Sequence, residues 1–174
     1  NGYMNKKFDF ILLPPDGFHQ TFDDLLSKSN QIFLNLEKNI KKLSKKEKKN
    51  FIVKYRHELQ QKNFPCLSNY IVSYGNLLNY CHKKTIVIGP CGTAVLEVLK
   101  NNVQYYSYDF FQAFKKNRMI HNDFTSILYV AKTNNELIDN IKKKKIFKSG
   151  FKFENLIFTD GISLDKIIKK VLNF

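Results

Sequence analysis

Short apolar runs alternate with longer amphipathic segments along this chain, and Pro, Gly and Asn residues separate the two kinds of segment. Short continuous apolar runs are typical of strands that are buried on both faces of a sheet. Each run therefore predicts a strand. The predicted strands are Phe8–Leu13, Phe51–Tyr55, Tyr70–Ser73, Thr85–Ile88, Val103–Tyr108 and Ser126–Val130.

Between several of these runs, apolar residues recur with the spacing of a helix that has one buried face. Thr21 is a candidate N-cap for the longest such segment. The region around Pro65 predicts a loop, and Phe110–Asp123 fits neither pattern. The predicted helices are Thr21–Leu43, Asn76–Cys81, Thr93–Lys100, Asn134–Lys145 and a last helix capped by Ser163.

Strands and helices therefore alternate along the sequence, which favours a sheet covered by helices on both faces. We predict a Rossmann-like three-layer α/β domain with a mainly parallel sheet. No repeat, low-complexity tract or linker divides the chain, so residues 1–174 are interpreted as one domain. The alternating Tyr105, Tyr106 and Tyr108 are expected to pack on the sheet.

The composition shows a large excess of basic residues. The chain has 174 residues, of which 43% are hydrophobic and 25% charged, and its net charge is +14. Such a balance favours an anionic partner: nucleic acid, a membrane surface or phosphates. Only Arg56 and Arg118 are arginine, and arginine is the residue that recognises phosphates and bases in a bidentate manner. Nucleic acid is therefore disfavoured, and most lysines are interpreted as solvated surface.

Several other classes of protein do not fit the sequence. No apolar stretch approaches the roughly 18 residues of a membrane-spanning helix, and the first residues lack the pattern of a signal peptide. The three cysteines show no CxxC spacing, and the four histidines lie far apart. These features favour a reducing cytoplasm and predict neither a disulfide framework nor a metal site.

The chemistry is expected beyond the carboxyl ends of the strands, where open α/β sheets bind ligands. The strongest candidate is the turn between the strand at Ile88 and the following helix. Glycines there allow close approach of the backbone, the start of the helix attracts anions and lowers the pKa of a thiol, and Glu97 could reach a ribose hydroxyl. The candidate binding residues are Gly89, Pro90, Cys91, Gly92, Thr93 and Glu97.

Further candidates follow two other predicted strands. Lys54, Arg56 and His57 could bind phosphate or supply acid–base chemistry, although exposed polar loop residues would look the same. Asp16 and His19 follow the first strand in a stretch that is also typical of a simple turn.

The segment Thr85–Leu99, followed by Asn101–Tyr106, resembles the C-terminal, nucleotide-sugar-binding half of GT-B glycosyltransferases. The resemblance is to bacterial surface-polysaccharide transferases of the polysialyltransferase or glycerophosphotransferase kind, which build capsule or lipopolysaccharide. Phe51–Glu58 is similar to the strand end that precedes this segment in that half. Ser126–Thr133, with the helix after it, is similar to a later strand and helix.

The resemblance implies a role for each candidate residue. The turn from Gly89 to Thr93 would hold the donor phosphates, and Glu97 would bind the ribose. His57, with Lys54 or Arg56, would neutralise the departing phosphate without a metal. The implied donor is a CMP-, UDP- or GDP-linked sugar, the acceptor a glycan or lipid-linked molecule, and no separate cofactor is expected. The resemblance also implies a missing N-terminal acceptor domain, so we expect the chain to be either an excised C-terminal half or a stand-alone relic of one.

Two alternatives remain open at this stage. The lysine runs Lys41–Lys49 and Lys142–Lys145 are compatible with a module that binds polyanions or a membrane surface. A combined form is a glycosyltransferase held peripherally at the inner face of the cytoplasmic membrane. The other alternative is a nucleotide-binding α/β domain without catalytic activity.

Overall fold

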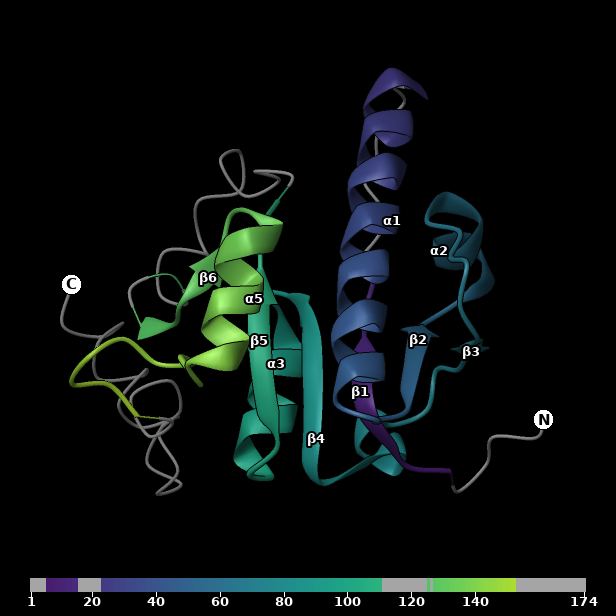
Figure 1. The fold of residues 1–174 in the computed structure, drawn as a ribbon. Coiled ribbons are helices and arrows are strands. Elements are labelled where there is room, and N and C mark those ends of the chain that lie inside the picture. Colours follow the sequence, from purple (N-terminus) through teal and green to yellow (C-terminus); the bar gives the residue numbers. More distant parts are fainter. Residues whose placement is uncertain (1–5, 16–22, 111–124, 126, 153–174) are drawn as a thin grey trace, which may run out of the picture.

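Six parallel strands form one sheet with the order β3-β2-β1-β4-β5-β6, as Figure 1 shows. The computed structural model describes residues 6–15, 23–110, 125 and 127–152, without the side chains of residues 23–28 and Thr93. The strands are β1 (Phe8–Leu12), β2 (Phe51–Tyr55), β3 (Tyr70–Val72), β4 (Cys81–Pro90), β5 (Gln104–Tyr108) and β6 (Val130–Ala131). The predicted parallel α/β sheet is confirmed.

Helices cover both faces of this sheet (Figure 1). They are α1 (Asp23–Lys46), α2 (Glu58–Asn63), the short 3-10 helix η1 (Leu77–Tyr80), α3 (Thr93–Lys100) and α5 (Asn134–Lys142). The helices α1 and α5 share one hydrophobic core with the sheet, whereas α3 and η1 share the other. None of the described helices is long and apolar enough to cross a membrane.

The two cores follow from the alternation of side chains along each strand. In β1, Phe10 and Leu12 face α1, whereas Ile11 faces α3, and all three are fully buried. Tyr106 packs in the first core and Tyr105 in the second, as expected for the tyrosines of this strand. Burying one such aliphatic side chain contributes roughly 1.5–3 kcal/mol, so the apolar runs account for the layered fold.

The structure differs from the sequence prediction at several elements. The strand β4 is Cys81–Pro90 rather than Thr85–Ile88, and the short helix before it is a 3-10 helix that ends at Tyr80. The predicted loop before Pro65 contains α2. The predicted strand Ser126–Val130 is shifted, because β6 is Val130–Ala131 and Leu128 instead bridges antiparallel to Phe147. The helix α5 ends at Lys142 rather than Lys145. The candidate cap Thr21 and the last predicted helix lie outside the described residues.

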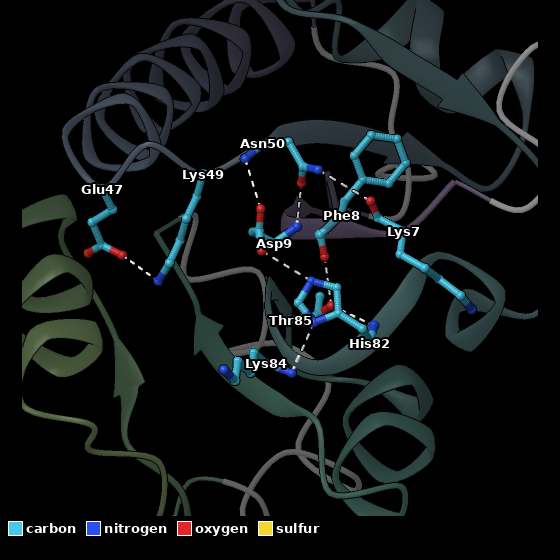
Figure 2. Close-up of polar contacts among 9 residues, drawn as sticks. All are labelled: Lys7, Phe8, Asp9, Glu47, Lys49, Asn50, His82, Lys84 and Thr85. Carbon is cyan, nitrogen blue, oxygen red and sulfur yellow. Dashed lines mark hydrogen bonds and ion pairs between the residues drawn. The ribbon is translucent and has the colours of Figure 1, made fainter.

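A polar network joins the amino ends of β1, β2 and β4, as Figure 2 shows. The backbone amide of Asn50 donates to the Asp9 carboxylate over 3.0 Å, and His82 Nε2 lies 3.1 Å from the other Asp9 oxygen. The Thr85 hydroxyl donates to the carbonyl oxygen of Phe8 over 2.6 Å. These bonds fix the three strands at the end of the sheet where they begin.

Candidate functional site

A cleft with a volume of about 280 Å³ opens beyond the carboxyl ends of β1, β2 and β4, on the face that carries α3. The chain runs outward from β1 to β3 and then crosses to β4 on the other side of β1. The border between β1 and β4 is therefore the point where the direction of strand progression reverses. In open α/β sheets, ligands bind at this point. The cleft thus lies where the topology predicts a ligand site.

Two cations form one wall of the cleft. Lys54, in β2, is 7% exposed, and its Nζ donates to the carbonyl oxygen of Ser73 over 2.9 Å. Burial lowers the pKa of Lys54, and the nearby Glu97 carboxylate only partly opposes this shift. Arg56 follows β2 and is exposed, and no described carboxylate forms an ion pair with its guanidinium group. Its donors are therefore available to a ligand within the described part of the site.

The start of α3 forms the opposite wall. Gly92 is the N-cap of this helix, and no side chain of the described residues caps its first-turn amides with a hydrogen bond. A Cβ atom at Gly92 would meet nothing within 4 Å, so this residue leaves open space in front of the helix start. Backbone amides and the helix dipole together favour an anion at such a position.

Glu97 places a carboxylate in the same cleft, one helical turn after Thr93. Its charge acts on Lys54, which links the two walls electrostatically. The cleft therefore presents two cations and one carboxylate, a combination that suits a ligand with both phosphate and hydroxyl groups.

Gln60, in α2, holds the strand ends that carry the cations. Its buried side chain donates to the carbonyl oxygens of Pro14 and Pro15 over 3.0 and 2.9 Å, and it accepts a 2.7 Å bond from the amide of Arg56. One amide side chain thus joins the end of β1 to the end of β2. The sequence did not single out Gln60, because a lone glutamine in a predicted loop carries no distinguishing pattern.

Tyrosines from β5 hold the ends of β1 and β4. The Tyr105 hydroxyl donates to the carbonyl oxygen of Pro90 over 2.7 Å, and the Tyr108 hydroxyl donates to that of Leu13 over 2.8 Å. The amide of Leu13 donates directly to Ile88 over 2.7 Å. The floor of the cleft is therefore fixed by bonds between neighbouring strands.

Gly89 and Cys91 have structural surroundings that differ from the sequence expectation. A Cβ atom at Gly89 would collide with the Tyr105 hydroxyl and touch Leu13, so this glycine makes room for protein atoms rather than for a ligand. Burial raises the pKa of the Cys91 thiol to about 11, and this effect outweighs the lowering expected at a helix start.

The remaining predicted residues are placed as follows. Pro90, Cys91 and Gly92 line the cleft with Lys54, Arg56 and Glu97. Thr93 begins α3, and Asp16 and His19 lie outside the described residues.

His57 lines a neighbouring groove with Tyr74 and Leu59 instead of the cleft itself. Its Nδ1 accepts the amide of Gln60 over 3.1 Å as the N-cap of α2, and its ring stacks on Tyr74 at 6.2 Å. This cap explains why the polar stretch Glu58–Asn63 forms a helix.

Fold and site together define a parallel α/β protein with a charged cleft at the reversal point of its sheet. Comparisons with protein-family models, curated proteins and solved structures found no match. Among the described residues, no cluster of three histidine, cysteine or acidic side chains could hold a metal ion.

Proposed function

We propose that the cleft binds the diphosphate of a nucleotide-activated sugar, and that the chain is the donor-binding half of a glycosyltransferase with a glycan or lipid-linked acceptor. One observation carries this proposal: Lys54 and Arg56 line the same cleft as the bare start of α3 and Glu97. The resemblance of Thr85–Tyr106 to the nucleotide-sugar-binding half of GT-B transferases supports the choice of ligand within the broader class of nucleotides.

The groups in the cleft divide naturally between the parts of such a donor. Arg56 offers a planar set of donors that fits phosphate oxygens, and Lys54 adds a fixed positive charge. The open space at Gly92 lets a phosphate approach the first amides of α3. Glu97 accepts hydrogen bonds from ribose hydroxyls.

Catalysis by such a site rests on stabilising the charge that develops on the leaving nucleotide. Of the predicted cations, Lys54 and Arg56 lie in the cleft, and they carry the proposed contact with the departing phosphate. His57, in the neighbouring groove, is proposed to act at the edge of the site. Its cap on α2 also positions Gln60, which holds the amide of Arg56.

The proposal is tested by calorimetric titration of the protein with UDP-, GDP- and CMP-linked sugars. We expect one of them to bind, and Arg56→Ala and Glu97→Gln each to weaken its affinity 10- to 100-fold, as is typical for hydrogen bonds that involve charged groups. Lys62→Ala is the matched control, because Lys62 is an exposed cation on α2 that does not line the cleft. No binding of any of these donors to the folded protein would refute the proposal.

An assay of sugar transfer distinguishes the proposed glycosyltransferase from a nucleotide-binding domain without transferase activity. The glycosyltransferase proposal expects Arg56→Ala to abolish product formation. Binding that is lost without any effect on product formation would show that the cleft is not the donor site.

A further inference from the structure

The parallel strands all begin at the end of the sheet opposite from the cleft (Figure 1), and many of the described lysines belong to segments at that end. The helices α1 and α3 each connect two strands, and both helices end at that same end of the sheet. The segment after α5 returns to the same side, because Lys148 N donates to Ile127 O ahead of β6. We call this surface the basic pole. Its lysines are Lys6, Lys7, Lys45, Lys46, Lys48, Lys49, Lys83, Lys84, Lys100, Lys142, Lys143, Lys144 and Lys145.

Little negative charge offsets these lysines. All of them are exposed except Lys145, which is partly buried. The acids of the same described segments are Asp9, Glu47 and Asp139, and each already has a partner. Asp9 contacts His82, Glu47 contacts Lys49 over 2.6 Å, and Asp139 contacts Lys143 over 2.8 Å (Figure 2 shows the first two).

The ends of helices explain only part of this concentration. Lysines in the last turn of a helix complement its dipole, which accounts for Lys45, Lys46, Lys100 and Lys142. Lys83 and Lys84, however, lie in the first part of β4, outside the last turn of the short helix η1 that precedes it. The basic pole therefore carries more lysine than the helix ends require.

Two positions at the basic pole keep lysine where the backbone favours another residue. Lys48 and Lys144 have left-handed φ angles of 54° and 53°. The equivalent position after α3 is Asn102, with φ of 56°, and asparagine or glycine is the usual residue in this conformation. The other two helix ends carry lysine at this position, so each adds a positive charge to the basic pole.

We propose that the basic pole docks the protein on an anionic membrane surface. The described segments of the basic pole contain lysine but no arginine. Arginine is the residue that recognises nucleic-acid bases and stacks on them. Two aromatic rings beneath the basic pole are covered by lysines: Lys49 lies over Phe10 at 5.4 Å and Lys145 over Tyr129 at 5.6 Å. These features fit acidic lipid headgroups, which need charge and no base recognition.

The spread of the lysines also fits a broad surface. They lie in or next to segments at the amino ends of β2, β1, β4, β5 and β6. These five strands are adjacent in the sheet and span roughly 19 Å at about 4.8 Å per strand spacing. Exposed lysines act within a Debye length of about 8 Å, so the attraction depends on the number that reach the surface together. The cleft lies at the far end of the sheet and stays open to solution, so nucleotide and membrane binding do not compete.

The test is sedimentation of the protein with phosphatidylcholine vesicles that contain about one third phosphatidylglycerol. The variant Lys46→Gln/Lys83→Gln/Lys142→Gln removes three exposed lysines of the basic pole. The matched control, Lys38→Gln/Lys62→Gln/Lys132→Gln, removes three exposed lysines elsewhere and changes the net charge equally. We expect the first variant to lose affinity at least about tenfold and the control less than about threefold.

Circular dichroism checks that both variants fold, and pure phosphatidylcholine vesicles should bind neither. Equal losses in the two variants, or no binding of the wild-type protein to acidic vesicles, would overturn the proposal. Tighter binding of duplex or single-stranded DNA than of vesicles, with the same sensitivity to the basic-pole variant, would overturn the choice of a membrane in favour of nucleic acid. The readout requires no nucleotide sugar, so its failure is separate from any failure of the proposed donor site.

Discussion

The two ends of the sheet carry charge in opposite ways. At the cleft, Lys54 is nearly buried and bonded to Ser73, and Gln60 holds the backbone of Arg56. At the basic pole, the lysines are numerous and almost all exposed, and their acidic neighbours are already paired. The cleft therefore relies on the position of a few groups, whereas the basic pole relies on the number of its charges.

This difference has a consequence for how each end responds to change. Partly buried charges that hydrogen bonds fix in place are screened weakly by salt, whereas exposed charges lose much of their attraction. A single substitution at the cleft should therefore have a large effect, and several should be needed at the basic pole.

Two buried thiols report on the two ends of β4. Burial raises the pKa of both Cys81, at its amino end, and Cys91, just beyond its carboxyl end, to about 11. The reactive thiolate is therefore scarce at pH 8, and we expect iodoacetamide to modify both about two orders of magnitude more slowly than in the urea-unfolded chain. Mass spectrometry of timed samples measures the rates. Fast reaction of Cys91 alone would show that the cleft end opens locally.

The two glycines of the β4–α3 turn should respond oppositely to a methyl group. Gly89→Ala forces a Cβ atom against Tyr105 and Leu13, and we expect a loss of about 2–3 kcal/mol in the free energy of unfolding. Gly92→Ala should change that free energy by less than about 0.5 kcal/mol, because its Cβ atom points into open space. Urea denaturation compares the two variants. Equal stabilities would contradict the packing described for Gly89.

Replacing the buried cation of the cleft should stabilise the fold. We expect Lys54→Met to raise the free energy of unfolding by about 1 kcal/mol at pH 7, because burial penalises the charged form, and to weaken nucleotide binding. The exposed Lys62→Met is the control and should change little.

The pH dependence of this gain has a defined sign. Burial lowers the pKa of Lys54 from 10.5, so the folded chain releases this proton at a lower pH than the unfolded chain. Wild-type stability therefore rises with pH between the two values, and the advantage of Lys54→Met should shrink there. An advantage that grows with pH would contradict the direction of the shift.

The smallest effect is expected at the basic pole. Lys48→Gly relieves a left-handed φ angle of 54° and should add about 0.5–1 kcal/mol to the free energy of unfolding. The control is Lys38→Gly at an exposed position inside α1, which should lower the free energy of unfolding by about 1 kcal/mol. Thermal unfolding distinguishes the two. A loss of stability in Lys48→Gly would mean that its side chain contributes more to the fold than its conformation costs.

Local patterns predicted most of the strands and α3, because buried parallel strands need continuous apolar runs. They missed α2, since Glu58–Asn63 has no apolar face and depends on the His57 cap and on Gln60. The shifted β6 reflects the antiparallel bridge of Leu128 to Phe147, a contact that follows from the tertiary fold and not from the local sequence.

The candidate site was predicted in part. Lys54 and Glu97 were singled out from separate strand ends, and only the strand order brings them to one cleft. Gly89 makes room for the Tyr105 side chain from β5 rather than for a ligand, and the local sequence does not reveal this contact. The lysine runs are evident in the sequence. Their common location at the amino end of the sheet follows only from the directions of α1, α3 and α5.

The contrast between the two ends is tested most directly by locating the residues at which a nucleotide binds. An anionic ligand is attracted to any part of a chain with a net charge of +14, so its location is decisive. In backbone NMR spectra of the protein titrated with UDP-, GDP- or CMP-linked sugars, we predict shifts of the amides of Gly92, Ala94 and Glu97 and unchanged signals at Lys46 and Lys83. Shifts confined to the basic pole, or none at any residue, would contradict the account.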